Sequence, residues 1–192
     1  MQMIDWKQYV IILMSSILFA APTSCKKLDE QGFRTYTIKC GKHKSRNRYK
    51  TTRTDQLSFQ VIFDESAKYT SVDPINQYDV NKLYGLSDCG SSHTESSIRF
   101  GWRWLNDSLE ILWFKHVNGN FSFAKIKSID IDQIVDFSIT FDHRNYYMSV
   151  GGDVVTVPRP CGGGGIRKYY LWPYFGGNEV APHDIKIKIK DI

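Results

Sequence analysis

The sequence contains no apolar run long enough to span a membrane as a helix. Its amino-terminal stretch of residues 9–21 is uncharged over 13 residues, whereas a spanning helix needs about 20 apolar residues. Helical periodicity is also scarce, and the only helix we expect is one or two turns within residues 78–86. The glycine run at residues 162–165 is not followed by the Lys-Ser/Thr pair of a phosphate-binding loop. These absences exclude a spanning helix, a mostly helical fold and a nucleotide-binding loop of this type.

Cysteine is scarce. Apart from Cys25, the chain has Cys40, Cys89 and Cys161, and their spacing matches no zinc-binding pattern. Three cysteines form at most one bridge, and the sequence does not choose the pair. We expect these cysteines to be structural or incidental. No cofactor is predicted except a structural calcium ion, for which Asp184, just before the last strand, offers a carboxylate ligand.

The amino terminus has the layout of an export signal. Lys7 supplies the positive charge that precedes the uncharged stretch of residues 9–21, as in a secretory signal peptide. Small residues then lead into Cys25. A cysteine in this position resembles the lipobox of bacterial lipoproteins. The resemblance implies that residues 1–24 are a signal peptide and that Cys25 receives acyl chains such as palmitate, which anchor the protein in a membrane.

The residues around Cys25 bear on where the protein works. Pro22 stands where lipoproteins usually carry an aliphatic residue, so an ordinary secretory signal, with Cys25 free or paired, is the alternative. Residues 25–33 form a short charged tether that resembles the export tags of surface lipoproteins in glycan-degrading Gram-negative bacteria. We therefore predict an outer-membrane lipoprotein of the cell envelope, displayed at the surface, with the lipid membrane as a partner through Cys25.

Acidic residues are missing from residues 31–54, which hold eight basic ones. Such a segment can neutralise phosphates or sulfated and uronic-acid polymers, but it also suits a solvated loop or a surface that faces a membrane. Nucleic acid is not a predicted partner, because the chain is expected to be exported. The basic residues are Arg34, Lys39, Lys42, Lys44, Arg46, Arg48, Lys50 and Arg53.

Beyond Cys25 the apolar residues recur with a period of two, which is typical of half-buried strands. The stretch of residues 109–117 is apolar on both faces and suits a central strand, and Asn118-Gly119 predicts a tight hairpin after it. About ten short strands predict an all-β, antiparallel, two-sheet jelly-roll sandwich over residues 34–192, whose first and last strands pair. The clearest strands are at residues 34–40, 57–63, 98–104, 135–141 and 184–190.

Three segments carry a resemblance to a known group of proteins. Residues 169–184, with residues 100–104 and 117–119 before them, look like a group of uncharacterised bacterial lipoproteins whose expected fold is the concanavalin A-like jelly roll. The resemblance covers roughly residues 34–192, so it implies this fold for nearly all of the mature chain. It brings no established activity, and fold alone does not imply function.

Glycoside hydrolases are frequent on this fold, and the retaining ones need two carboxylates on one face of a strand. Their pattern Glu-x-Asp-x-x-Glu is absent from the sequence. The nearest counterpart is formed by Asp130, Asp132 and Asp136, which we interpret as residues that flank the start of a strand. A hydrolase is therefore not predicted.

Polysaccharide lyases also use this fold, and the chain is distantly similar to them. Their β-elimination needs a group that neutralises the uronate carboxylate, a base and an acid. Lyase strands of the types Arg-x-Glu-x-Arg, Gln-x-His and Tyr-x-Lys have counterparts here in order and type, but the leading Arg, the Gln and the Lys are missing. The resemblance implies Arg99, His116 and Tyr174 as the catalytic residues of a lyase; a structural histidine near the hairpin is the alternative for His116.

A binding role requires less, namely aromatic rings that stack on sugars and planar polar groups for the hydroxyls. We expect Arg99 and Arg103 to share the face opposite the core, and Tyr170, Trp172 and Tyr174 to alternate onto one face of a late strand. Arg103, Tyr170 and Trp172 are therefore candidate ligand-binding residues, with core filling as the alternative for Trp172 and Tyr174. Our first hypothesis is an anchored, carbohydrate-binding lipoprotein without catalysis. A lyase for an acidic glycan is the second, and a structural or protein-binding lipoprotein is the third.

Overall fold

The computed structural model describes residues 28–45 and 49–192. Cys25, the predicted signal peptide of residues 1–24, and the basic residues Arg46 and Arg48 lie outside this part of the chain. Strands dominate the described residues, and the two helices found among them are short 3₁₀ turns, η1 (Glu65–Ala67) and η2 (Pro74–Tyr78). No helix in the described part is long and apolar enough to cross a bilayer.

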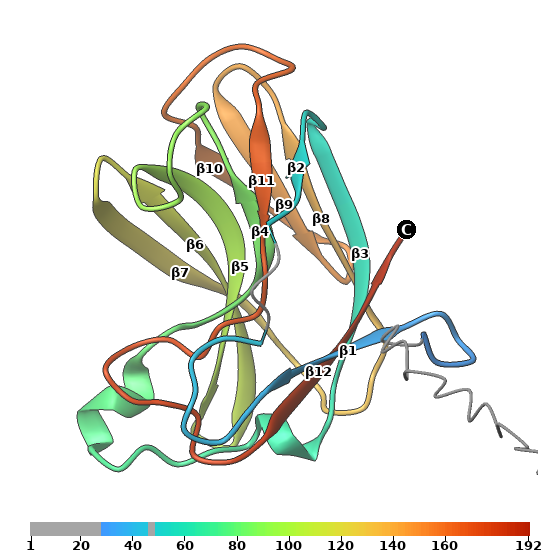
Figure 1. The fold of residues 1–192 in the computed structure, drawn as a ribbon, viewed down its shortest axis with the longest axis vertical. Coiled ribbons are helices and arrows are strands. Elements are labelled where there is room, and N and C mark those ends of the chain that lie inside the picture. Colours follow the sequence, from blue (N-terminus) through green and yellow to red (C-terminus); the bar gives the residue numbers. More distant parts are fainter. Residues whose placement is uncertain (1–27, 46–48) are drawn as a thin grey trace, which may run out of the picture.

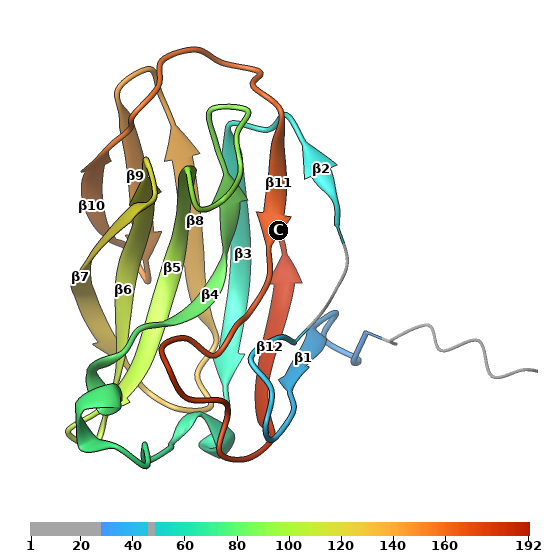
Figure 2. The same ribbon diagram turned by 60° about the vertical axis from the view of Figure 1, so that its left-hand side comes forward.

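The strands form two antiparallel sheets of six strands each, which face each other as the layers of a sandwich (Figures 1 and 2). The predicted all-β jelly-roll sandwich is confirmed. Sheet 1 has the order β1 (Arg34–Ile38), β12 (Ile185–Asp191), β3 (Gln56–Phe63), β8 (Val135–Phe141), β9 (Asn145–Val150) and β10 (Asp153–Pro158). Sheet 2 has the order β2 (Thr51–Thr52), β11 (Lys168–Leu171), β4 (Asn81–Ser87), β5 (Ser96–Leu105), β6 (Ser108–Val117) and β7 (Asn120–Ile129).

Alternating apolar residues from both sheets fill the space between them. Phe59 and Phe137 of sheet 1 lie with ring centroids 5.4 Å apart, and Phe100 of sheet 2 packs edge-on against both. All three are at most 1% exposed. Trp102 is fully buried, as expected. Since each buried phenylalanine contributes about 1.5–3 kcal/mol, the period-two pattern is what holds the two sheets together.

The chain ends and the central hairpin are arranged as the sequence predicts. β1 pairs with β12 in antiparallel register, with Arg34 opposite Ile189, so the first and last strands lie side by side. β6 and β7 are joined by Asn118 and Gly119, whose φ angles are +51° and +79°. Positive φ at both positions is what a type I′ turn requires.

The helix predicted within residues 78–86 is wrong. This segment contains β4, which is hydrogen-bonded between β11 and β5. A bulge between Lys82 and Gly85 leaves the consecutive side chains Leu83 and Tyr84 both in the core, where they are at most 1% exposed. Two adjacent buried residues break the period of two, so the strand had no clear signal in the sequence.

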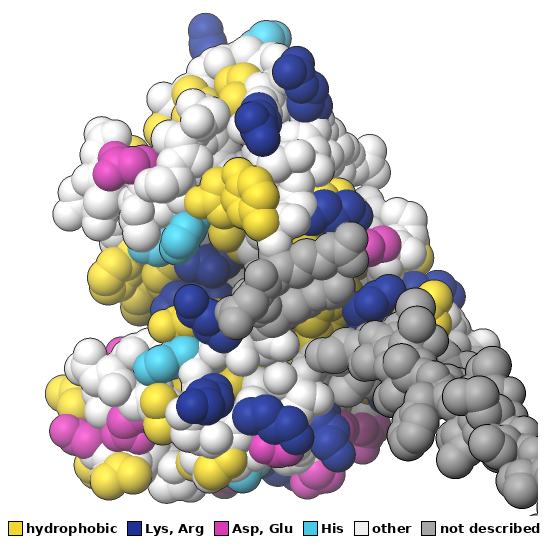
Figure 3. All heavy atoms as spheres, in the orientation of Figure 1, with side chains coloured by type: hydrophobic (Ala, Val, Ile, Leu, Met, Phe, Trp, Pro, Cys, Tyr) yellow, Lys and Arg dark blue, Asp and Glu magenta, His cyan; other side chains and the backbone are white. Residues whose placement is uncertain are grey.

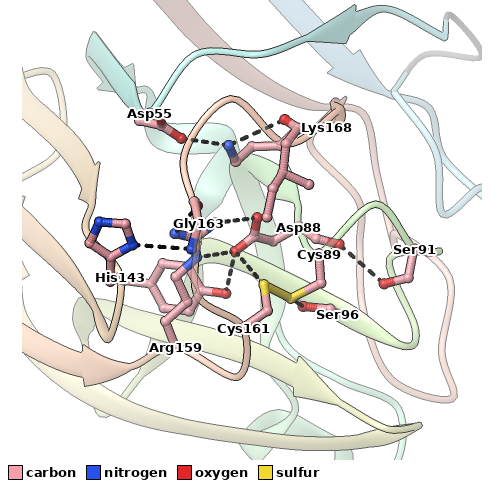
Figure 4. Close-up of a disulfide and its surroundings, with 12 residues drawn as sticks. Asp55, Asp88, Cys89, Ser91, Ser96, His143, Arg159, Cys161, Gly163 and Lys168 are labelled. Carbon is pink, nitrogen blue, oxygen red and sulfur yellow. Dashed lines mark hydrogen bonds and ion pairs between the residues drawn. A yellow bond between two sulfur atoms is a disulfide. The ribbon is translucent and has the colours of Figure 1, made fainter.

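A disulfide joins Cys89, which follows β4, to Cys161, which follows β10 (Figure 4). It lies beside a buried ion pair, in which the Arg159 guanidinium donates to both carboxylate oxygens of Asp88 over 2.6 and 2.9 Å. The Tyr146 hydroxyl donates to the same carboxylate over 2.9 Å. Since Asp88 follows a strand of sheet 2 and Tyr146 lies in sheet 1, the cluster ties the two sheets together.

The structure identifies Cys89 and Cys161 as the bonded pair, which the sequence alone did not choose. The bond closes a sequence separation of 72 residues, and Cys40 remains as an exposed thiol. One bridge and one free cysteine among the three agree with the predicted limit of one bridge.

Candidate functional site

The outer face of sheet 2, which points away from the core, carries the candidate site. In β5, Ile98 and Phe100 face the core, so Arg99, which lies between them, points to the outer face. The strand register places Phe114 of β6 on one side of Arg99 and Gly85 of β4 on the other. Figure 3 shows that Lys or Arg and His side chains gather around the hollowed middle of this face.

Arg99 is buried without an acidic partner among the residues that the structure describes. The residue is 8% exposed, its Nε has no hydrogen-bond partner, and no carboxylate among the described residues pairs with it. Gly85 allows the close packing, because a Cβ there would collide with the Cβ of Arg99 and the carbonyl oxygen of Ile98. Burial lowers the pKa of Arg99 to about 10. The site therefore holds a costly buried cation that nothing in the described chain neutralises.

Lys82 of β4 adds a second, half-buried cation. Its Nζ lies 4.6 Å from the centroid of the Phe114 ring, and Cζ of Arg99 lies 5.7 Å from the same centroid. Both distances are in the range of cation–π contacts. Burial, and next the positive charge of Arg99, lower the pKa of Lys82 to about 8, with Asp79 acting in the opposite direction. An anion bound between the two cations would relieve their repulsion.

A hollow of about 350 Å³ opens over Arg99, and we call it the cationic hollow. Lys44 enters it from the chain segment before β2, where it forms an isolated bridge with Tyr174. No acidic residue is among the described residues that line it. The polar and aromatic residues that line it are Lys44, Tyr49, His93, Arg99, Tyr169, Tyr170, Trp172 and Tyr174.

Tyr169 and His93 form a hydrogen-bonded pair in the cationic hollow. The backbone N–H of His93 donates to the Tyr169 hydroxyl over 2.6 Å, and that hydroxyl lies 3.0 Å from Nδ1 of the same histidine. Burial, followed by the charges of Arg99 and Lys44, lowers the pKa of His93, while burial raises the pKa of Tyr169. In its neutral form the imidazole can accept a hydrogen bond from the Tyr169 hydroxyl at Nδ1.

His116 lies on the same outer face, opposite Ser97 in the ladder between β5 and β6. The Ser97 hydroxyl donates to the His93 carbonyl over 2.7 Å, so toward Nδ1 of His116, 3.4 Å away, it can only accept. This arrangement places the His116 proton on Nδ1 and leaves a lone pair on Nε2. Burial, and then the charges of Arg99, His93 and Lys82, lower the pKa of His116 to about 4.

The expectation that Tyr170, Trp172 and Tyr174 share one face is wrong. Tyr170 and Trp172 stack on the buried Tyr84, with ring centroids 5.9 and 5.3 Å from it, and pack against the core. Tyr174 exchanges both backbone hydrogen bonds with Lys82 and so lies on the outer face with that residue. Its ring stacks on His43 at 5.2 Å.

The change of face has a physical cause in the bulge of β4. Leu171 pairs with Gly85 and Tyr174 with Lys82, so the two outward residues are three positions apart instead of two. Pro173 lies in this interval and cannot donate a ladder hydrogen bond. Tyr174 therefore projects from the outer face beside Arg99, whereas Tyr170 and Trp172 stack on Tyr84 at the core. Both of these rings are only partly buried and still contribute to the lining of the cationic hollow.

Arg103 shares the outer face with Arg99, as expected, but its charge is neutralised. Its Nε donates to Glu110 over 2.7 Å, and Nη1 donates to the carbonyl of Tyr78 over 2.9 Å. Glu110 also binds Lys125 over 2.8 Å. Arg103 is absent from the lining of the cationic hollow, so the structure gives it a role in joining strands.

The structure gives no support to a calcium ion at Asp184. The carboxylate binds Nζ of Lys39 over 2.6 Å and accepts the backbone N–H of Cys40 over 3.0 Å. Within the described part of the chain, the group of residues with metal-ligating atoms close together is Asp88, Cys89 and Cys161, and the two sulfurs of that group are bonded to each other.

Several side chains of the candidate site were missed by sequence reasoning. Lys82 was hidden by the bulge in β4, and His93 lies in a loop with no motif. Tyr169 had a usable signal, because it has the opposite parity to Tyr170 and must face outward if Tyr170 faces the core. Lys44 was noted only as part of the basic segment.

No protein-family model matches the chain, and no curated protein matches it either. Solved structures do match it. The alginate lyase AlyC3 superimposes with a TM-score of 0.61 at 10% sequence identity, over 88% of this chain and 77% of that chain. The chain is a concanavalin A-like jelly roll. The predicted distant similarity to polysaccharide lyases holds at the level of the fold.

Two further structures show the same likeness. The alginate lyase in complex with dimannuronate gives a TM-score of 0.53 at 10% identity, over 86% of this chain and 75% of that chain. The laminarinase catalytic domain of Thermotoga maritima MSB8 gives a TM-score of 0.54 at 12% identity, over 88% of this chain and 82% of that chain. At such identities the likeness shows the fold alone, and function must be argued from the site.

Proposed function

We propose that this protein binds a polysaccharide containing uronic acid, with the carboxylate of one sugar unit on Arg99 and Lys82. The observation that carries the proposal is the burial of Arg99 without an acidic partner in the described chain. Burying a charge away from water costs on the order of several kcal/mol unless an opposite charge compensates for it. A bound anion supplies that compensation, because the guanidinium matches a carboxylate with two parallel hydrogen bonds.

The rest of the cationic hollow suits a sugar. Tyr49 and Tyr169 lie with ring centroids 5.0 Å apart and offer apolar ring surface next to polar hydroxyl groups, as sugar sites do. Phosphate or sulfate would also satisfy Arg99 and Lys82. We favour a uronate because an alginate lyase of the same fold has been solved with dimannuronate.

Binding should weaken as the pH rises through the pKa of Lys82. Burial lowers this pKa to about 8, so Lys82 is mostly protonated near pH ~7 and mostly neutral near pH ~9, while Arg99 keeps its charge. A bound carboxylate raises the pKa of Lys82, so the observed midpoint lies at or above this value. Losing one of two cations should reduce the affinity for an oligomannuronate about tenfold, or about 1.4 kcal/mol. Isothermal titration calorimetry at both pH values measures this change in affinity.

Two variants identify the titrating group. Lys82→Arg should bind equally well at both pH values, because its guanidinium does not lose its proton in this range. Lys82→Met should bind weakly at both. If Lys82→Arg keeps the pH dependence of the wild type, another group is responsible. If no variant and no wild-type sample binds an oligouronate at either pH, the proposed function fails.

A second candidate function is β-elimination, favoured by the neutral imidazole of His116. Its low pKa and its free Nε2 lone pair suit it to accept the C5 proton of a bound uronate. Arg99 and Lys82 would stabilise the charge that develops on the carboxylate. The C4–O bond would break as the C4–C5 double bond forms, and a phenol, from Tyr169 or Tyr174, would protonate the leaving oxygen.

Catalysis is distinguished from binding by the product. A lyase should release oligosaccharides whose conjugated C4–C5 double bond absorbs in the ultraviolet when the protein is incubated with polymannuronate. His116→Ala should lower the rate about 100-fold or more and leave the affinity nearly unchanged. Tight binding by the wild type without new absorbance would leave binding alone as the function.

We also propose that Cys25, outside the described residues, is lipidated and holds the protein in the outer membrane. The support lies in the sequence, in the uncharged stretch of residues 9–21 and the small residues that precede the cysteine. Metabolic labelling with radioactive palmitate should label the wild type and leave Cys25→Ser unlabelled. Equal labelling of both would contradict the anchor.

A further inference from the structure

A second hollow adjoins the cationic hollow on the same face of sheet 2, and we call it the aromatic hollow. It measures about 320 Å³. The ring of Phe114 contributes to its lining, and Phe114 is paired across the ladder with Arg99, which lines the cationic hollow. The two hollows therefore lie side by side. The residues of the aromatic hollow that matter here are Asp79, Lys82, Phe114, His116, Phe121 and Phe123.

Three phenylalanine rings form an apolar wall along the aromatic hollow. Phe121 and Phe123 of β7 lie opposite His116 and Phe114 of β6. The centroid of Phe114 is 5.6 Å from that of Phe121 and 6.1 Å from that of Phe123, and all three rings are parallel within 12°. Phe121 is 62% exposed and Phe123 39% exposed. Adjacent exposed aromatic side chains of this kind mark a binding surface, and parallel rings suit the C–H face of a sugar.

The charges of the aromatic hollow differ from those of the cationic one. Asp79 belongs to its lining, and its charge acts against the effect of Arg99 on the pKa of Lys82. Oδ2 of Asp79 is buried and has no hydrogen-bond partner. Lys82 also lines this hollow, but in the proposed function it binds the first carboxylate. A second carboxylate would therefore meet the negative charge of Asp79, whereas an uncharged sugar would not. The aromatic hollow therefore disfavours a second uronate next to the one on Arg99.

We propose that the aromatic hollow binds an uncharged sugar unit against Phe121 and Phe123, so that the ligand is a polysaccharide in which uronic acid and neutral sugars alternate. The inference rests on the proposed function and narrows its substrate class. A homopolymer of uronic acids would place a carboxylate beside Asp79 and the phenylalanine wall. An alternating polymer places its acid on Arg99 and the apolar face of its neighbour on the wall.

The test compares two octasaccharides of equal length by calorimetry. One is a hyaluronan fragment, in which glucuronic acid alternates with N-acetylglucosamine, and the other is octamannuronate, in which every unit is acidic. The wild type should bind the hyaluronan fragment about tenfold more tightly, the scale of a sugar–aromatic contact. The double variant Phe121→Ala/Phe123→Ala should lose this preference and keep its affinity for octamannuronate.

A control variant and the possible contrary results distinguish a failure of the alternating-ligand proposal from a failure of uronate binding. Val154→Ala removes an exposed apolar side chain of β10, outside both hollows, and should change neither affinity. If the wild type binds both octasaccharides equally, or if the double variant weakens both equally, the alternating ligand is contradicted while uronate binding stands. If the wild type binds neither, the proposed function itself fails. Thermal unfolding verifies that both variants are folded.

Discussion

Replacing Arg99 with methionine should lower the affinity for an oligouronate about 100-fold and leave the fold at least as stable as the wild type. The loss of affinity reflects charge-assisted hydrogen bonds, which are worth about 1.5–3 kcal/mol each. The gain in stability follows because methionine removes a buried cation that has no partner in the described chain. We expect the free energy of unfolding to rise by about 1 kcal/mol and the melting temperature by about 3 °C. Calorimetry measures both quantities.

Arg103→Met is the matched control, because Arg103 lies on the same strand and the same face. Its Nε binds Glu110 over 2.7 Å, so its removal should lower stability and change the affinity little. The two variants are therefore expected to move stability and binding in opposite ways. Equal loss of affinity in both would show that general positive charge attracts the ligand. Destabilisation by Arg99→Met with unchanged binding would make Arg99 a structural residue.

Arg159→Met should have the largest effect on stability, about 3–5 kcal/mol less favourable folding. The side chains of Arg159 and Asp88 are 1% and 0% exposed, so the variant leaves a carboxylate buried without its cation. Tyr146 still donates to Asp88 over 2.9 Å, but it carries no charge to neutralise the acid. Urea unfolding with the disulfide intact measures the loss.

Two further variants show that the effect comes from the uncompensated charge. Arg159→Met/Asp88→Leu removes both charges and should be more stable than Arg159→Met alone, since replacing a whole buried pair costs less than breaking it. Lys39→Met breaks an ion pair whose side chains are 68% and 39% exposed, and it should leave the unfolding midpoint almost unchanged. A single variant Arg159→Met as stable as Lys39→Met would contradict the account of this cluster.

Strands and their order could be predicted because burial in this fold repeats along the sequence. Residues 135–141 alternate strictly, and they form β8 with the same bounds. The hairpin followed from Asn118 and Gly119, because only a few residues accept positive φ at both positions of a turn. β4 escaped prediction because its bulge buries Leu83 and Tyr84 in succession.

The candidate site was harder to predict, because it depends on which residues face each other across strands. The outer face of Arg99 and Arg103 followed from parity. Parity also predicted one shared face for Tyr170 and Tyr174, and this prediction was wrong. The three-residue interval opposite the bulge of β4 places the two side chains on opposite faces.

Partnerships between distant residues carry no local pattern. The partner of Arg103 cannot be recognised until the register of β5 and β6 is known, because that register places Glu110 opposite it. The same register places Phe114 opposite Arg99, so Arg99 has no acidic partner there among the described residues. Asp88 and Arg159 are 71 positions apart, and nothing in their surroundings links them before the chain folds.

The central claim is that Arg99 and Lys82 bind the carboxylate of a sugar. The most direct test compares an oligouronate with the same oligosaccharide after its carboxyl groups have been reduced to hydroxymethyl groups, which changes the charge and little else. Titration calorimetry should show the reduced form binding at least about tenfold more weakly to the wild type, and Arg99→Met should bind both forms equally weakly. Equal affinity of the wild-type protein for the acidic and the reduced oligosaccharide would contradict the account.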